Sequence, residues 1–203
     1  MDDEGGTAMT DGVRADVESQ PLCFRFTKTV KARSDRTPKE LLRRPSDFAE
    51  WLATVGLSTG VRPPEVDEQL LREAWELRES IYRAARSLAD GHPLTEADRD
   101  HINAWAARDD AYRVLDGTGA AWRFPGPSPA RSALAVLAGD AVDTLGGTRS
   151  GTIKVCAGTG CVAVFLDTTR GRSRRWCSMG TCGNRAKKDA MRVRHETAPP
   201  SGA

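Results

Sequence analysis

The sequence lacks any long apolar run. Its longest, Ala133–Ala138, has six residues, whereas a helix that spans a membrane needs about 20. It also lacks a secretory signal, because residues 1–20 are acidic, rich in glycine and without an apolar core. The P-loop, GxGxxG, GxSxG and HExxH motifs are absent, which argues against an enzyme. We therefore expect a cytoplasmic protein with no membrane partner and a disordered tail over residues 1–20.

Acidic residues are scarce toward the C-terminus. Residues 151–195 contain ten Lys and Arg but only two acids, Asp167 and Asp189, which gives this segment a net charge of +8. Residues 1–150 carry 20 basic and 25 acidic side chains, a net charge of −5. A basic segment attached to an acidic body indicates a polyanion as partner.

Apolar residues recur at helical spacing through residues 21–147, so we expect a mostly helical domain there. Leu22–Thr29 alternates apolar and polar residues and fits either a short strand or the start of a helix, and residues 121–124 fit a strand. The capping residues and the Gly and Pro breaks place four helices. They are expected after Ser46, from Pro63-Pro64 to Gly91, from Thr95 toward Leu115, and from Ser128 to Leu145.

Four of the five cysteines have the pattern C-x4-C-x15-C-x4-C. Two short cysteine pairs are typical of a structural zinc site, in which four thiolates surround the metal as a tetrahedron. Residues 162–176, between the pairs, fit a hairpin. Disulfides or free buried thiols are the alternatives, and a reducing compartment favours the metal. The predicted ligands of Zn²⁺ are Cys156, Cys161, Cys177 and Cys182, whereas Cys23 fits a small buried hydrophobe.

Three stretches around these cysteines resemble a known family. C-G-N-R (Cys182–Arg185), F-L-D-T-T (Phe165–Thr169) and R-R-W-C-S-M (Arg174–Met179) resemble the CGNR zinc fingers of small bacterial proteins regarded as stress-induced transcription regulators. The resemblance implies that the four cysteines bind zinc and that the finger binds DNA. Upstream, Leu71–Arg83 resembles the helical ABATE domain that accompanies this finger.

The start of the helical domain departs from that family. The family motif is close to L-C-L-D-F-V-N-T, and this chain has Arg25 and Lys28 where the motif has an acid and an amide. If this segment lines a pocket, the two cations are candidates for binding a carboxylate or phosphate of a small anionic ligand. A plain solvent-facing position is the alternative.

The basic residues of the finger suggest how it binds DNA. Asn184 suits the N-cap of a helix over Arg185–His195, with a cationic stripe on one side and Ala186, Ala190 and Val193 packed inward. Such a helix can lie along phosphates or enter a major groove. A solvated face, paired in part with acids or with the thiolates, is the alternative. The predicted nucleic-acid contacts are Arg170, Arg172, Arg174, Arg175, Arg185, Lys188 and Arg192.

The sequence thus predicts a mainly α fold: a tail over 1–20, a helical ABATE-like domain over 21–147, a β-hairpin/helix zinc finger over 148–196, and a flexible tail over 197–203. We expect a DNA-binding transcription regulator that responds to a ligand through its helical domain. A small-molecule binder or biosynthetic enzyme with a purely structural zinc, and a protein-interaction adaptor, are the alternatives. A homodimer remains open.

Overall fold

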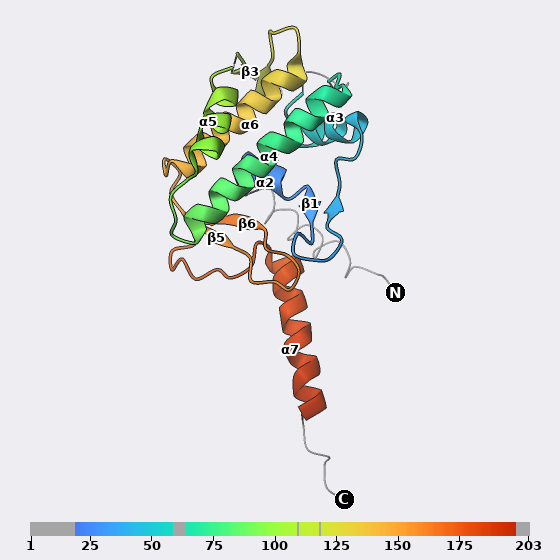
Figure 1. The fold of residues 1–203 in the computed structure, drawn as a ribbon, viewed down its shortest axis with the longest axis vertical. Coiled ribbons are helices and arrows are strands. Elements are labelled where there is room, and N and C mark those ends of the chain that lie inside the picture. The colour runs from blue at the N-terminus through green and yellow to red at the C-terminus, as the bar shows by residue number, and fades with distance from the viewer. Residues whose placement is uncertain (1–18, 59–63, 109, 118, 198–203) are drawn as a thin grey trace, which may run out of the picture.

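The computed structural model describes residues 19–58, 64–108, 110–117 and 119–197 (Figure 1). The tails predicted over residues 1–20 and 197–203 lie almost wholly outside these ranges. Among the described residues, no helix is long and apolar enough to cross a membrane. The elements are α2 (Leu22–Thr27), β1 (Val30–Lys31), β2 (Lys39–Glu40), α3 (Pro45–Thr54), α4 (Glu68–Ala89), α5 (Glu96–Ala106), β3 (Tyr112–Asp116), β4 (Gly119–Arg123), α6 (Pro129–Leu145), β5 (Thr152–Val155), β6 (Val164–Asp167), a π-helical turn η1 (Met179–Gly183) and α7 (Asn184–Thr197).

The helical body surrounds α6, whose Ala133–Ala138 segment is buried by α2, α4 and α5 (Figure 1). The predicted cap of α5 is confirmed, because the Asp98 amide donates to Thr95 Oγ1 at 3.2 Å. Helix α4 begins later than predicted, since the Asp67 side chain accepts from the Leu70 amide at 2.7 Å and caps the helix there. Leu22–Thr27 is helical, which decides between the two structures predicted for it.

A hairpin follows α5 where the sequence predicted more helix. Helix α5 ends at Ala106, and β3 pairs antiparallel with β4 from Tyr112–Arg123 to Asp116–Gly119. Leu115, taken as the apolar end of the helix, is 89% exposed in β3. The apolar spacing therefore continued by chance beyond the real end of α5.

The cysteine segment shares a core with the helical body. Strand β6 pairs with β5, not with residues 174–176, so the hairpin predicted over residues 162–176 is wrong. All four residues of β6 are buried, and Val164 and Leu166 belong to the main core with α2 and α4. The buried Gln20 side chain fixes this contact, because it accepts from the Leu166 amide at 2.8 Å and donates to the Leu166 carbonyl at 3.2 Å.

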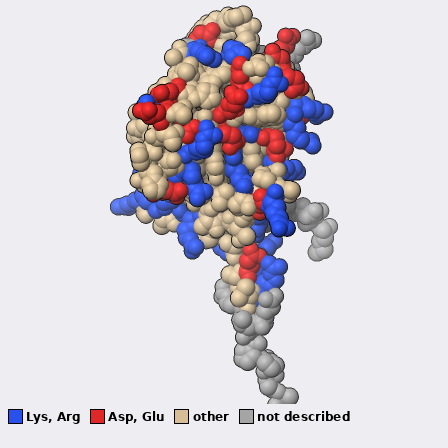
Figure 2. Space-filling model, viewed as in Figure 1, with Lys and Arg blue, Asp and Glu red and all other residues tan. Residues whose placement is uncertain are grey.

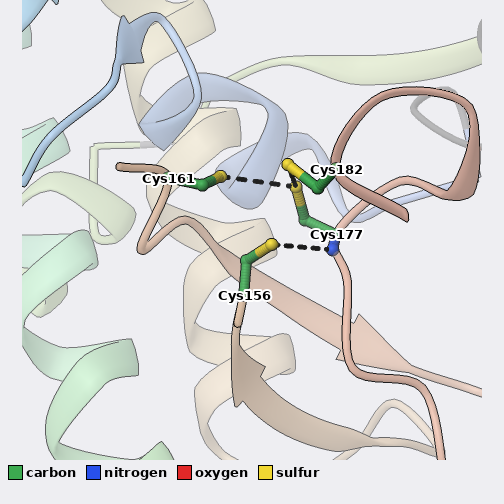
Figure 3. A group of neighbouring side chains, drawn as sticks. All are labelled: Cys156, Cys161, Cys177 and Cys182. Atoms are coloured by element: carbon green, nitrogen blue, oxygen red, sulfur yellow. Dashed lines mark hydrogen bonds between the residues drawn. The ribbon is translucent and has the colours of Figure 1, made fainter. Parts of the chain in front are cut away.

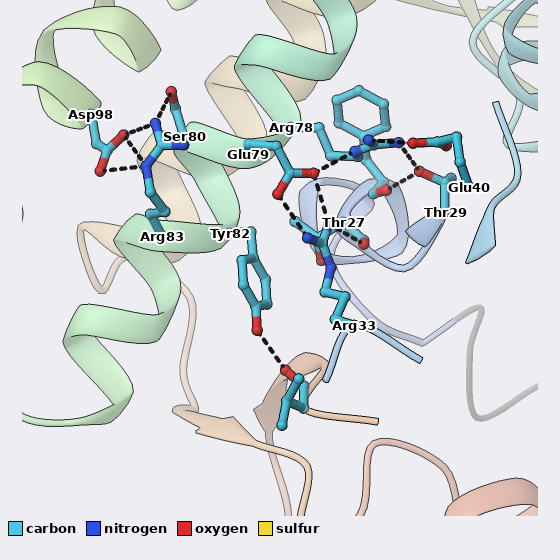
Figure 4. A network of polar contacts seen from close by, with 12 residues as sticks. Thr27, Thr29, Arg33, Glu40, Arg78, Glu79, Ser80, Tyr82, Arg83 and Asp98 are labelled. Atoms are coloured by element: carbon cyan, nitrogen blue, oxygen red, sulfur yellow. Dashed lines mark hydrogen bonds and ion pairs between the residues drawn. The ribbon is translucent and has the colours of Figure 1, made fainter. Parts of the chain in front are cut away.

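Ion pairs on α4 hold the segment that follows α2 (Figure 4). Arg78 binds both oxygens of Glu40, with a shortest distance of 2.6 Å, and Arg33 binds Glu79 at 2.7 Å. The same face of α4 reaches the cysteine segment, because the Tyr82 hydroxyl donates to the Val162 carbonyl at 3.0 Å. Helix α4 therefore contacts both the β1–β2 segment and the first cysteine loop.

Helix α7 projects away from the rest of the molecule (Figure 1). The inward packing predicted for Val193 is wrong, because its side chain is 57% exposed, and Ala190 is exposed too. Asn184 does not cap the helix: its side-chain amide donates to the Gly180 carbonyl at 3.3 Å, and the helical turns begin already at Met179. Its N-terminal end is anchored to η1.

Candidate metal centre and nucleic-acid interface

The four predicted ligands come together from two loops. Cys156 follows β5 directly and Cys161 lies in the loop that leads to β6, whereas Cys177 precedes η1 and Cys182 lies in it. Their Sγ atoms all lie within 4.8 Å of one another (Figure 3). Gly158 allows this approach, because a Cβ on it would lie 3.0 Å from the Cβ of Cys182.

The sulfur spacing fits a tetrahedral metal ion. Cys161 Sγ lies 3.7 Å and Cys182 Sγ 3.9 Å from Cys177 Sγ. A tetrahedron with Zn–S bonds of about 2.3 Å has S–S edges of about 3.8 Å, whereas a disulfide bond is about 2.05 Å long. All five cysteines are free thiols. The donors therefore suit Zn²⁺, and a disulfide does not match this geometry.

Four thiols packed this closely cannot all ionise without a cation. Contacts with the sulfurs of Cys161 and Cys177, together with the Cys177 and Gly158 amides, hold the pKa of Cys156 far below its usual range. The sulfur contacts raise the pKa of Cys177 in turn. A bound divalent ion would allow all four thiols to ionise, because it lowers the pKa of each thiol that it coordinates.

Lys28 is a buried cation whose charge interacts with the cysteine cluster. Its side chain is 8% exposed, and its Nζ has no hydrogen-bond partner within the described part of the chain. Burial lowers the pKa of Lys28, and the charges of Cys177 and Cys161 oppose that shift. An unpaired buried ammonium is costly, whereas four thiolates around Zn²⁺ carry a net charge of −2. The orphaned Lys28 Nζ thus fits a metal-loaded cluster.

Asp167 organises the loop between the two cysteine pairs. Its buried carboxylate accepts from Lys154 Nζ at 2.9 Å, the Thr169 hydroxyl at 2.6 Å and the Arg174 amide at 3.0 Å. Burial opposes ionisation, but these hydrogen bonds hold the pKa of Asp167 well below its usual range. This role was not predicted from the sequence, although Asp followed by Thr two residues later is typical of an Asx turn.

Two of the seven predicted nucleic-acid residues make contacts inside this loop. Arg174 donates from Nε to the Trp176 carbonyl at 2.9 Å and from a terminal nitrogen to the Cys177 carbonyl at 3.0 Å. Arg172 donates to the Asp167 carbonyl and to Ser150 Oγ. Arg174 thus holds the chain at Cys177, and Arg172 holds the chain at Asp167, so both guanidiniums are less available to phosphates than the sequence suggested.

The other five predicted cations are exposed. Arg192 pairs with Asp189 at 2.5 Å, and the Arg175 guanidinium lies 5.4 Å from the centre of the Trp176 ring. The other three, Arg170, Arg185 and Lys188, make no hydrogen bond or ion pair with any described residue. The same holds for Lys187, which was not among the predicted contacts. Figure 2 shows Lys and Arg side chains along α7 and the neighbouring end of the body.

The structure separates the two candidate ligand-binding residues. Arg25, half-buried on α2, lines a cavity of about 1020 Å³, whereas Lys28 is buried just after the helix and is not among the residues that line this cavity. A joint anion site of Arg25 and Lys28 thus stays a prediction, and Arg25 is the one of the two that lines this cavity. The sequence could not reveal this, because it did not show where α2 ends.

Comparison with known families gives two matches. The ABATE family model, described as "Putative stress-induced transcription regulator", matches residues 20–148. The CGNR zinc-finger model matches residues 152–195, which include all four clustered cysteines. No curated protein matches the chain.

Proposed function

Because this chain belongs to the ABATE family and carries a CGNR zinc finger, we propose that it is a zinc-dependent, DNA-binding transcription regulator. Zinc bound by the four cysteines would tie the two loops together and supply folding free energy to the segment between them. Four thiolates leave no open coordination position, so this metal is structural and not catalytic.

The observation that carries the proposal is the state of α7. The helix projects from the metal centre, and Arg185, Lys187 and Lys188 on its first turns are exposed without partners among the described residues. Cys182 lies in η1, directly before α7. Zinc would therefore fix the direction in which this cationic helix leaves the body, as binding along a duplex requires.

The test is the salt dependence of binding to duplex DNA, measured by fluorescence anisotropy on the zinc-loaded full-length protein. Each neutralised phosphate contributes about −0.9 to the slope of log K against log salt. Lys188→Ala should reduce the magnitude of the slope by about one unit. Arg72→Ala, an exposed arginine on α4 that contacts only Gln69 within the described chain, is the matched control and should leave the slope unchanged.

A residue that reads a base would behave differently. Arg185 and Arg192 are the candidates because they lie on the exposed stripe of α7. Loss of such a residue should relax the preference at one base pair at a cost of about 1–3 kcal/mol. A folded, zinc-loaded protein that binds no duplex at low salt would contradict the proposal and favour the adaptor or the biosynthetic protein.

We further propose that the helical body senses a ligand. What supports this is the cavity lined by Arg25, which adjoins both the body and β6. A catalytic function finds no comparable support, because His101, one of the described histidines, is engaged by Ser80 and Trp105 in a structural network.

A further inference from the structure

A large cavity lies where the helical body meets the finger. Its volume is about 1020 Å³, near the upper end of the range for sites that enclose small organic molecules. Helices α2 and α6 and the β3–β4 hairpin form the wall on the side of the body. Residues 149–150, Leu166 and Thr168 form the wall on the side of the finger.

The charged residues of the cavity are unequally engaged. Asp140 accepts from the Cys23 amide at 2.9 Å and from Arg149, and Asp143 accepts from the Thr148 hydroxyl at 3.2 Å. Arg25 is half-buried and makes no hydrogen bond or ion pair with any described residue. Asp140 is thus held by the chain and Asp143 is exposed, whereas Arg25 and the exposed Arg113 reach the cavity with guanidinium donors that no described residue uses.

Apolar side chains line part of the cavity beside these charges. Leu22, Val136 and Leu166 contribute aliphatic surface, and Trp122 contributes a half-buried indole with the Arg113 guanidinium 5.8 Å from its centre. Counting Arg25, Arg113 and Arg149 against Asp140 and Asp143, the lining carries a net charge of +1. That balance suits a monoanion with an apolar part better than a dianionic phosphate, which would also meet two carboxylates.

We infer that this cavity binds an amphipathic organic carboxylate, held by the fork of Arg25 and packed against Trp122. An arginine fork matches a carboxylate geometrically and forms strong charge-assisted hydrogen bonds. The site rests on the cavity itself, and its role as an effector site rests on the proposed function.

The cavity is connected to the cysteine segment through Leu166. Leu166 lines the cavity, and Gln20, another lining residue, holds its backbone. The next residue, Asp167, accepts from the Arg174 amide, and the Arg174 side chain holds the Cys177 carbonyl. A ligand against Leu166 therefore acts one residue away from the scaffold of the metal centre.

The test measures binding of the probe 2-naphthoate to the zinc-loaded full-length protein in the absence of DNA. Calorimetry gives the affinity. Arg25→Met should weaken binding at least about tenfold, because a hydrogen-bonded charge is lost. Arg25→Lys should restore part of the affinity. Val142→Glu places an anion at the exposed cavity rim without touching the core and should also weaken binding. Arg72→Met is the matched control and should bind like the wild type.

Two analogues define the chemical class. The neutral amide 2-naphthamide should bind more weakly than 2-naphthoate and without dependence on Arg25. Tighter binding of naphthyl phosphate would overturn the assignment to a carboxylate. Equal affinity of wild type and a folded Arg25→Met for 2-naphthoate, or no binding at millimolar concentration, would overturn the site itself.

A second measurement addresses regulation separately. Saturating 2-naphthoate should change the affinity of the wild type for duplex DNA and leave that of Arg25→Met unchanged. If the probe binds but the protein never binds DNA, the cavity site is supported and the proposed regulator function is wrong. If the probe binds and the affinity for DNA does not change, the cavity site is supported and its role as an effector site is wrong.

Discussion

Each clustered cysteine supplies one corner of the metal site, so replacing one should release the metal. We expect Cys182→Ser to lose the zinc ion, because three thiolates no longer close a structural tetrahedron. The measurement is metal content per chain with a chromophoric chelator after desalting. Cys23→Ala is the control, because Cys23 lies against Asp140 and outside the cluster, and this variant should keep one zinc ion. Retention of a full equivalent by Cys182→Ser would contradict the assignment.

The buried charge of Lys28 should affect how tightly the cluster holds its metal. Lys28→Met removes a buried cation whose charge interacts with Cys161 and Cys177, so it should weaken zinc binding by the anionic thiolate cluster. Competition with a chelator measures this affinity directly. Arg25→Met is a control on the same helix whose side chain lines the cavity instead. Equal zinc affinity in the two variants would refute a role for Lys28.

At the scale of elements, the ion pair between α4 and α5 makes stability depend on pH. Burial disfavours the charged form of Asp98, but hydrogen bonds from Arg83 and Thr95 hold its pKa below the usual range. Ionised Asp98 therefore stabilises the fold above about pH 4, and this stabilisation is lost as the pH falls through the lowered folded pKa.

Asp98→Asn should lower the free energy of unfolding by about 1–3 kcal/mol at pH 7, because the ionised hydrogen-bond partner of Arg83 is lost. The difference from wild type should shrink below about pH 4. Urea unfolding followed by circular dichroism at the two pH values measures it. Asp90→Asn breaks an exposed pair with Arg86 and should change stability by less than about 0.5 kcal/mol. A difference that does not depend on pH would contradict the lowered pKa.

Elements with several agreeing local signals were predictable from the sequence. The Thr95 cap, the Ser128-Pro129 start of α6 and the cysteine spacing each combine a residue preference with a pattern, and the structure confirms them. The β3–β4 hairpin was missed because the apolar spacing continued by chance as far as Leu115. The pairing of β5 with β6 was missed because it depends on burial against α2 and α4.

In the candidate site, too, some features could be predicted from the sequence and others could not. The cysteine cluster follows from the spacing, whereas the carbonyl contacts of Arg174 and the burial of Lys28 depend on how the loops fold. A row of arginines looks uniform in a sequence. Backbone carbonyls then engage some of them and leave others in solvent, and only the folded chain shows which.

At the scale of the whole molecule, the finger and the helical body are built on one core. Val164 and Leu166 pack with the helices, and Gln20 and Tyr82 bond to the backbone of the cysteine segment. We therefore expect both parts to unfold together in one cooperative transition.

Gln20→Ala tests this coupling, because it leaves the buried amide and carbonyl of Leu166 without their partner at a cost of about 1–3 kcal/mol. Thermal unfolding should be followed by circular dichroism for the helices and by zinc release to a chelator for the finger. Both midpoints should fall together by several degrees, since about 1 kcal/mol corresponds to roughly 2–4 °C at this chain length. Gln69→Ala, an exposed glutamine on α4 bonded to Glu73, should change neither midpoint. Zinc release well below the loss of helix in the wild type would show instead that the finger unfolds alone.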